Sequence, residues 1–353
     1  MNKLKIGIIG CGGISRMHIN SYLKNPDVEL YALCDINEER LKKAADEYGI
    51  TRTFTDAKDM LALHEIDAVS VCTWNSEHMP CAIAALNAGK HVLCEKPMSI
   101  NAECAEKMKE AADKNGKILM IGFVRRFGHD MQLLEDFGKQ DYMGEIYYAN
   151  ARYLRRKGNP GGWFGDKARS GGGPLIDLGV HMIDFVKYSM GNPKPTSVYC
   201  VTYQKLFERS NIKTSAGYVS MTEASKKKCD VEDFASLMLR FDNGATMHLE
   251  TSFSLNIEKE TNEIELFGTK AGVKLGDKMK FITEENGYLA NVEIETNASM
   301  DFDGAFSREI NNFVDAILGR TECKNPAEDG IEMMKILDAA YESARTGHEV
   351  IIK

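Results

Sequence analysis

The chain has 353 residues, of which 43 % are hydrophobic and 27 % are charged, and its formal net charge is −8. A chain of this length usually divides into two domains, and this composition is that of an ordinary soluble globular protein. The acidic balance offers no basic surface to nucleic acid or to an anionic membrane, and no apolar run reaches the roughly 18 residues of a membrane span. The sequence therefore favours a small-molecule partner.

The N-terminal residues lead directly into a strand pattern and are not expected to form a signal peptide. The nine cysteines are scattered and contain no C-x-x-C pair. We therefore expect reduced core cysteines, neither a disulfide framework nor a metal cluster, and a cytoplasmic protein.

The first 123 residues alternate short β-rich runs with longer amphipathic segments. Strands are expected at 5–9, 29–34, 68–72, 91–94 and 118–123, with helices at 38–48, 80–88 and 102–115. This alternation is typical of βαβ units and predicts a parallel sheet.

A glycine-rich turn follows the first predicted strand. Gly10, Gly12 and Gly13, then Ile14, stand between this strand and a helical pattern. In that position glycine lets the backbone approach a pyrophosphate, whose charge meets a helix N-terminus. Ser15 replaces the third glycine of the strict pattern but is small enough for close helix packing. The turn predicts a dinucleotide site.

Asp35, at the end of the second predicted strand, decides the expected cofactor. A carboxylate there accepts hydrogen bonds from the adenosine ribose diol and repels a 2′-phosphate. The pattern thus predicts NAD, with NADP less favoured. Arg40 follows one helical turn later and is interpreted as part of a solvated face.

Glu95-Lys96-Pro97 ends the fourth predicted strand. Ligands of open α/β sheets bind beyond the carboxyl ends of the strands, so Lys96 is expected beside the nicotinamide. By itself, a lysine at a strand end is most often a surface charge. Its functional interpretation depends on a second group of residues further along the chain.

The second part of the chain shows segments of alternating polarity. Strands are expected at 146–154, 196–203, 234–241, 246–253, 262–267 and 272–275, followed by helices at 307–318 and 328–346. Asp242-Asn243-Gly244 marks a hairpin between two of these strands. They predict a mostly antiparallel sheet with a few helices. The polar stretch 209–230 interrupts it, and loops of that length are often functional or mobile.

The stretch from Gly171 to Asp184 places ionisable groups in an otherwise apolar helix that continues to Met190. Residues four apart are neighbours on a helix, so Asp177 and His181 are expected side by side, with Asp184 on the same face. A buried, satisfied Asp–His pair is the alternative.

Joined to Lys96, this helix completes a set suited to alcohol oxidation. An ammonium can hold and polarise the hydroxyl oxygen, an imidazole can take its proton, and a carboxylate can orient both. This chemistry requires no metal, and the eight histidines show no ligand spacing.

These motifs together resemble the Gfo/Idh/MocA family of NAD(P)-dependent oxidoreductases, which includes inositol dehydrogenases and glucose–fructose oxidoreductase. The resemblance is carried by residues 10–15, 73–78, 95–97, 122–127 and 177–181, in the family's order. Trp74 departs from the proline that the family usually has. The resemblance implies an α/β plus α+β fold. Residues 1–123 would form a doubly wound Rossmann domain. Residues 124–353 would form a substrate-binding and oligomerisation domain on a large open, mainly antiparallel sheet, and its last helices can pack back on the first domain.

By position, the resemblance implies that Lys96 assists proton transfer, Asp177 positions the substrate and His181 is the acid/base. The expected cofactor contacts are Gly10, Gly12, Gly13, Ile14, Asp35, Thr73, Asn75, His78, Glu95, Lys96 and Arg126. The expected substrate contacts are Lys96, Arg126, Tyr153, Arg155, Trp163, Arg169, Asp177 and His181. Trp163 can either stack on a sugar ring or anchor its own loop.

The leading hypothesis is an NAD-dependent dehydrogenase that reversibly oxidises a ring hydroxyl of a cyclic polyol such as an inositol, a sugar or a glycoside. An alternative uses the same oxidation transiently, because a 3-keto sugar acidifies the neighbouring C–H, so that a glycosidic bond is eliminated and the cofactor is regenerated. A third possibility is a cofactor-bound regulator that has lost the chemistry. We expect a homodimer or homotetramer assembled through the sheet of the second domain.

Overall fold

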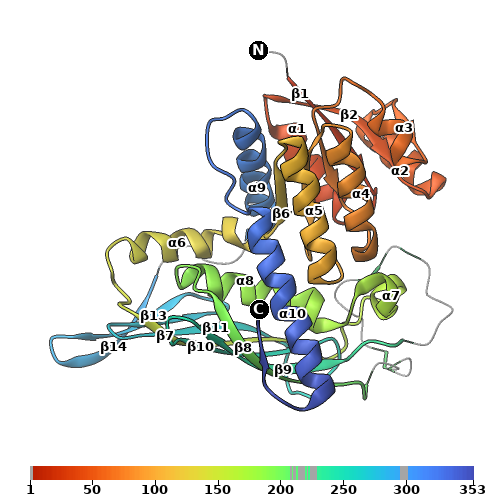
Figure 1. Ribbon diagram of the computed structural model, residues 1–353. Coiled ribbons are helices and arrows are strands. Elements are labelled where there is room, and N and C mark those ends of the chain that lie inside the picture. The colour runs from red at the N-terminus through yellow and green to blue at the C-terminus, as the bar shows by residue number, and fades with distance from the viewer. Residues whose placement is uncertain are drawn as a thin grey trace. The chain divides into compact units, whose positions relative to one another are not determined.

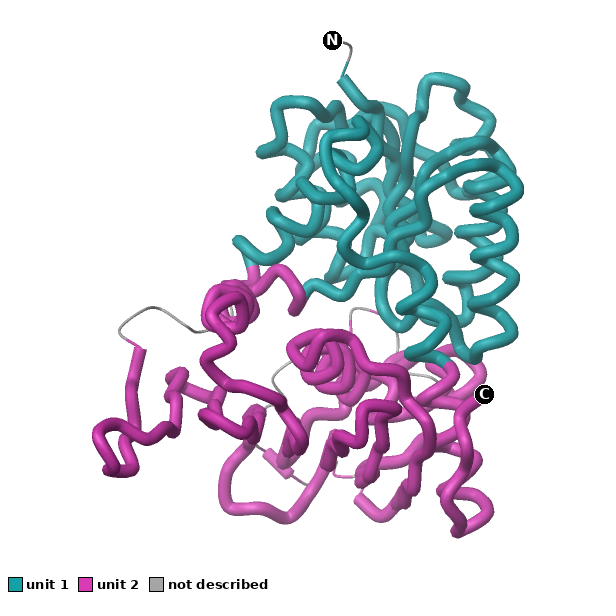
Figure 2. Tube along the Cα trace, turned by 60° about the vertical axis from the view of Figure 1, so that its left-hand side comes forward, with its two compact units in different colours: residues 1–124, 303–334 teal, residues 125–302, 335–353 magenta. Residues whose placement is uncertain are grey.

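The computed structural model (Figure 1) describes residues 3–206, 209, 212–213, 219–220, 222, 229–294 and 301–353. The chain forms two compact units, coloured separately in Figure 2. Unit 1 comprises Met1–Val124 and Asp303–Met334, and unit 2 comprises Arg125–Phe302 and Lys335–Lys353. Most of the polar stretch 209–230 lies outside the described residues, so the expectation of a functional or mobile loop stays a prediction.

The described strands of unit 1 form a parallel sheet. They are β1 (Leu4–Ile9), β2 (Val28–Cys34), β3 (Thr53–Phe54), β4 (Ala68–Val71), β5 (His91–Glu95) and β6 (Leu119–Gly122). Their order is β3-β2-β1-β4-β5-β6, and each neighbouring pair is parallel. This is the doubly wound order of a Rossmann domain, which confirms the predicted parallel sheet. The two residues of β3 were not predicted, because so short a strand shows no periodicity.

Helices connect these strands, and three of them begin at a residue whose side chain caps the first turn. They are α1 (Ser15–Lys24), α2 (Glu38–Tyr48), α3 (Ala57–Leu61), α4 (Asn75–Asn87) and α5 (Ala102–Asn115), and α9 (Phe302–Ile317) joins them from the C-terminal part. The Asn37 side chain accepts the Arg40 N–H at the start of α2, and Gly49 ends that helix with φ 69°. Figure 1 shows α4 and α5 side by side over the strands.

The described strands of unit 2 form a second, larger sheet. They are β7 (Ile146–Leu154), β8 (Pro195–Tyr203), β9 (Phe234–Phe241), β10 (Thr246–Ser252), β11 (Thr261–Gly268), β12 (Gly272–Leu275), β13 (Lys280–Glu285), β14 (Tyr288–Glu293) and β15 (Val350–Ile351). Their order is β14-β13-β12-β11-β7-β10-β9-β8-β15. The β7–β10 pair is parallel and the other described pairs are antiparallel, which confirms the predicted fold class. The predicted hairpin joins β9 to β10.

One face of this sheet is packed. Residues alternate along β9, where Leu237 and Leu239 are buried while Met238 and Arg240 are exposed. The helical segments of unit 2 include α6 (His129–Gly138), η2 (Gly162–Gly165), α7 (Lys167–Ser170), η3 (Leu175–Gly179) and α8 (Val180–Ser189). Helix α8 contacts β7, β10 and β11 and lies along the sheet in Figure 1. The core of unit 2 is therefore the layer between α8 and the buried face of the sheet.

Two helices and the edge strands complete the description. The short helix η1 (Val124–Phe127) has its first residue in unit 1 and the others in unit 2, and α10 (Ala327–Thr346) also contributes residues to both. Strands β13 and β14 were not predicted, because most of their residues are exposed and Phe281 is the only buried residue in these two described strands. None of the helices in the described part of the chain is long and apolar enough to cross a membrane.

Candidate active site

The glycine turn between β1 and α1 has the backbone that the sequence predicts. Gly10 has φ 92° and its N–H donates to Cys34 O at 2.8 Å. A Cβ atom at Gly10 would lie 2.6 Å from Cys72 O, so only glycine fits there. At Gly12, in contrast, a Cβ atom would meet open space. The turn therefore combines close packing below Gly10 with an accessible backbone at Gly12, which fits a cradle for a dinucleotide pyrophosphate.

Asp35 lies just beyond β2 and has both carboxylate oxygens occupied. Oδ2 accepts the Cys11 N–H at 2.7 Å and Arg40 Nε at 2.9 Å. Oδ1 accepts the Asn37 N–H at 2.8 Å and Arg40 Nη2 at 2.9 Å. The interpretation of Arg40 as part of a solvated face was therefore wrong. Its guanidinium folds back from the first turn of α2 because two parallel hydrogen bonds to a carboxylate stabilise it more than hydration in solvent does.

Lys96 stands at the carboxyl end of β5 in a rigid setting. Among residues 92–99, all of them described, it is the only one that is not buried. Both of its chain neighbours are held by histidines: His18 Nε2 lies 2.8 Å from Glu95 Oε1, and His78 Nδ1 lies 2.8 Å from Pro97 O. These contacts come from α1 and α4, so two helices fix the backbone that carries Lys96.

The Glu95 side of this arrangement continues as a buried network. His18 Nδ1 lies 3.1 Å from Ser70 Oγ, which in turn lies 2.8 Å from Tyr22 Oη. Burial raises the pKa of Glu95, but the hydrogen bond from His18 and the nearby positive charges outweigh it and hold the pKa below its ordinary value. Glu95 is therefore a buried carboxylate kept ionised next to Lys96.

His78 was predicted to line the nicotinamide half of the cofactor site. Its ring is 1 % exposed, and Nε2 lies 3.2 Å from Thr73 O. Burial lowers the pKa of His78, and a neutral ring can donate to only one of its two carbonyl neighbours. The ring therefore joins two backbone segments of the strand ends. A direct contact of His78, Thr73 or Asn75 with the cofactor stays a prediction.

In unit 2 the predicted catalytic helix begins with a π-helical turn. Val180 N–H donates to Leu175 O, five residues back, and α8 follows. Of residues 172–187, each of which is described, Asp177 and His181 are the only two that are not buried. The sequence predicts this pair on one face, and π-turns inside helices are frequent at functional sites. Whether the two residues are catalytic stays a prediction.

Asp184 does not extend this partly exposed stripe, contrary to the expectation. Its side chain and that of Arg126 are each 2 % exposed, and Arg126 Nη2 lies 2.6 Å from Asp184 Oδ1. Arg126 Nε adds a contact at 3.0 Å, and the guanidinium lies 4.7 Å from the ring centre of Tyr188. A charge this deeply buried needs an ionic partner. The predicted role of Arg126 in cofactor and substrate binding stays a prediction beside this structural one.

Glu232 braces the start of the predicted catalytic helix and was not itself predicted from the sequence. Its carboxylate accepts the N–H groups of Gly173 at 2.9 Å and Leu175 at 3.2 Å and the Tyr341 O–H at 3.0 Å. Burial raises the pKa of Glu232. A Cβ atom at Gly172 would lie 2.0 Å from Tyr341 Oη, which explains a glycine there. Since Glu232 belongs to no motif and reaches the helix across 59 residues, no sequence signal identified it.

Several predicted substrate residues gather around the same helix. Tyr153 and Trp163 pack against a buried cluster of Phe164, Leu178 and Phe253. The rings of Trp163 and Phe164 stack with centres 4.0 Å apart, and the packing of Trp163 against this cluster favours its interpretation as a loop anchor. Contact with a sugar stays a prediction.

The two predicted arginines differ in their surroundings. Arg155 donates from Nη2 to Tyr153 Oη at 3.2 Å, which brings it to the same group. Arg169 is exposed, with Nε 3.6 Å from an oxygen of Asp166. The structure thus brings Tyr153, Arg155 and Trp163 together and leaves Arg169 on the surface.

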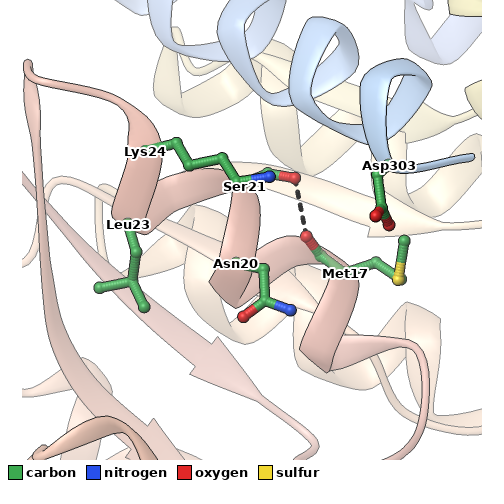
Figure 3. Close-up of a pocket in the computed structure, with 6 residues that line it drawn as sticks. All are labelled: Met17, Asn20, Ser21, Leu23, Lys24 and Asp303. Atoms are coloured by element: carbon green, nitrogen blue, oxygen red, sulfur yellow. Dashed lines mark hydrogen bonds between the residues drawn. The ribbon is translucent and has the colours of Figure 1, made fainter.

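A hollow of about 290 Å³ in unit 1 lies on α1 (Figure 3). It is lined by Met17, Asn20, Ser21, Leu23, Lys24 and Asp303. None of these is a predicted site residue. Within the described part of the chain, no group of three or more His, Cys, Asp or Glu side chains is arranged to hold a metal ion.

Comparisons with known proteins agree with this geometry. Residues 4–123 match the model of the oxidoreductase family with an NAD-binding Rossmann fold, and residues 131–274 match the GFO/IDH/MocA C-terminal domain. The chain belongs to the Gfo/Idh/MocA oxidoreductase family. It is thus an oxidoreductase with an NAD-binding Rossmann domain, as the resemblance implied.

Two curated relatives and one solved structure illustrate the likeness. D-glucoside 3-dehydrogenase of Escherichia coli K12 is 36 % identical over 98 % of this chain and 97 % of its own length. Myo-inositol 2-dehydrogenase of Thermotoga maritima is 29 % identical over 80 % of this chain and 79 % of its own. The crystal structure of an oxidoreductase domain protein from Kribbella flavida superposes with a TM-score of 0.87 at 25 % identity, covering both chains completely.

Proposed function

We propose that this protein is an NAD-dependent dehydrogenase that reversibly oxidises a ring secondary hydroxyl of a sugar, glycoside or cyclic polyol to the ketone. One observation carries the proposal. Asp177 and His181 are the only residues of the described stretch 172–187 that are not buried. Lys96 is likewise the only residue of the described stretch 92–99 that is not buried. Ionisable side chains that emerge singly from rigid, buried segments are what a catalytic site requires.

The three side chains have complementary roles. His181 accepts the hydroxyl proton as the alcohol is oxidised and returns it in the reverse direction, because imidazole exchanges protons near neutral pH. Lys96 holds and polarises the hydroxyl oxygen with its ammonium group and assists the proton transfer. Asp177 orients the substrate and, one helical turn away, the ring of His181. When bound, the nicotinamide cofactor supplies the hydride acceptor or donor.

The cofactor that we propose is NAD, with NADP less favoured. Gly10, Gly12, Gly13 and Ile14 would hold the pyrophosphate, and the Asp35 carboxylate would accept the adenosine ribose hydroxyls. The nicotinamide half would be lined by Thr73, Asn75, His78, Glu95, Lys96 and Arg126. His78 and Glu95 would act mainly through the backbone around Lys96, since both are buried.

The substrate class follows from the relatives and from the surroundings of the catalytic helix. Named relatives include a D-glucoside 3-dehydrogenase and a myo-inositol 2-dehydrogenase. The partly exposed aromatic rings of Tyr153 and Trp163 suit the apolar face of a pyranose, and Arg155 and Arg169 suit its hydroxyls. These relatives are named dehydrogenases, which does not favour the glycoside-cleaving alternative.

We also propose a homodimer or homotetramer that forms through the open face of the large sheet. Tyr199, Tyr203, Met238 and Phe267 on its strands are exposed apolar side chains. We propose a cytoplasmic location as well. The nine cysteines, all of them described, carry free thiols, as expected in a reducing compartment.

The test is a spectrophotometric assay of NADH formation with methyl glucosides, free hexoses and inositols, each with NAD⁺ and with NADP⁺. Lys96→Ala is the catalytic variant, and Lys42→Ala, in an exposed ion pair with Asp46, is the matched control. We expect NADH formation that falls at least about 100-fold in Lys96→Ala and persists in Lys42→Ala. Bound NADH without turnover on any of these substrates would overturn the proposal.

A further inference from the structure

We propose that Arg40 sets how strongly Asp35 discriminates between NAD and NADP: it competes with the adenosine ribose for the carboxylate, and its guanidinium receives a 2′-phosphate. The inference rests on the proposed function, because it assumes that a dinucleotide occupies the turn between β1 and α1. It adds to that function a role for Arg40, which would let the site accept NADP as well as NAD. The sequence alone placed Arg40 on a solvated face.

The carboxylate of Asp35 has no capacity to spare for a ribose diol. A carboxylate offers about four lone-pair positions. The described donors already use them: the N–H groups of Cys11 and Asn37 and two nitrogens of Arg40, at 2.7 to 2.9 Å. A diol that donates two hydrogen bonds must therefore replace two of these donors.

Arg40 is the donor that can leave. The Cys11 N–H belongs to the glycine turn, and Asn37 caps α2 by accepting the Arg40 N–H at 2.8 Å, so both backbone donors are fixed by the fold. The Arg40 side chain is 18 % exposed against 5 % for Asp35, which leaves it a route toward solvent. Ribose binding therefore exchanges the two guanidinium bonds for two hydroxyl bonds at an unchanged carboxylate.

The same pair changes the electrostatics that a 2′-phosphate meets. An unpaired aspartate repels the phosphate, whereas the Asp35–Arg40 pair has no net charge. The guanidinium also presents a planar fork of donors that matches phosphate oxygens. A small movement of the side chain would transfer this fork from Asp35 to the phosphate. The structure thus points to an enzyme that prefers NAD through Asp35 but accepts NADP through Arg40.

The experiment measures Kd for NADH and for NADPH by fluorescence titration, without substrate or turnover. The proteins are the wild type, Arg40→Ala, Arg40→Lys and, as a matched control, Arg345→Ala, which removes an arginine from an exposed ion pair with Glu342 on α10. We expect the ratio Kd(NADPH)/Kd(NADH) to rise about tenfold in Arg40→Ala, the size of one charge-assisted contact, and to stay unchanged in Arg345→Ala. Arg40→Lys keeps the charge but loses the fork, so its ratio should rise less.

Each other outcome decides against part of the account. A ratio in Arg40→Ala within twofold of the wild type, or a lower one, would overturn the role of Arg40 while leaving the proposed function in place. If Arg40→Ala does not fold in a thermal melt, the ratio in Arg40→Lys decides the question in the same direction. A folded wild type that binds neither nucleotide would overturn the proposed function and this inference together.

Discussion

Two arginine–aspartate pairs in this protein have similar geometry but different surroundings. Arg126–Asp184 joins η1 to α8, with both side chains 2 % exposed, whereas Arg40–Asp35 lies at the end of β2, with the arginine 18 % exposed. The first pair is closed to water and holds α8 in place. In the second pair the arginine reaches solvent, so a ligand can replace it at the Asp35 carboxylate.

The comparison teaches that exposure, more than contact distance, separates a structural ion pair from an exchangeable one. Removing one partner of a fully buried pair leaves an uncompensated charge, which is costly. Removing a partly exposed partner lets water replace it. The predictions below use this difference, from the largest expected effect to the smallest.

Arg126→Ala should lower the free energy of unfolding by about 3–5 kcal/mol, because Asp184 would remain buried without its partner. Arg40→Ala should cost clearly less, because water can reach Asp35. Urea denaturation of both variants and of the wild type measures the difference. Equal losses in the two variants would break the comparison.

His18→Ala tests whether Glu95, the carboxylate beside Lys96, depends on its partner as strongly as Asp184 depends on Arg126. Glu95 is 5 % exposed and His18 is its side-chain partner at 2.8 Å. We expect a loss of about 3 kcal/mol of unfolding free energy, since a buried charge loses its partner. His129→Ala, at a partly exposed position, is the control for loss of an imidazole. A loss below about 1 kcal/mol would show that Glu95 does not depend on His18.

Tyr341→Phe removes the hydrogen bond from Tyr341 to Glu232, which braces the predicted catalytic helix, and leaves the ring in place. We expect about 1 kcal/mol of destabilisation, the usual value for one such bond. A fall in kcat with unchanged KM would further show that the brace positions Asp177 and His181. Loss of stability together with unaltered kinetics would restrict Glu232 and Tyr341 to a purely structural role.

The pH dependence of Glu232 should give the smallest effect. Burial raises its folded-state pKa above the ordinary 4.5, so the folded protein binds this proton more tightly than the unfolded chain. Its contribution to stability is therefore fully present below pH 4.5 and is lost as the pH rises through the raised pKa. Glu232→Gln stays neutral, so its stability relative to the wild type should increase over that window. Denaturation curves at several pH values measure this, and a difference that does not change with pH would contradict it.

The sequence predicted what depends on local pattern. The βαβ alternation gave the parallel sheet, and Asp242-Asn243-Gly244 gave the hairpin between β9 and β10. The i,i+4 spacing of Asp177 and His181 gave a pair whose members alone stay partly exposed in the described stretch 172–187.

What the sequence could not give depends on contacts between distant residues. The sequence places Asp184 in a polar stripe, because its partner Arg126 lies 58 residues away in the chain and contacts it only in the folded protein. Glu232 likewise lies 59 residues from the turn that it braces. Arg40 is near Asp35 in the chain, but the direction of its side chain is settled by the packing of α2 against β2. Pattern locates candidate residues, and packing decides which of them a ligand can reach.

The central claim is that His181 exchanges the substrate proton in a dehydrogenase acting on a ring hydroxyl. The most direct measurement is kcat of His181→Asn with the best glycoside from the assay, taken with the Kd for NADH and the melting temperature of the same protein. We predict that kcat falls at least about 100-fold while NADH affinity and melting temperature stay unchanged. Full turnover by a folded His181→Asn that binds NADH would contradict the claim.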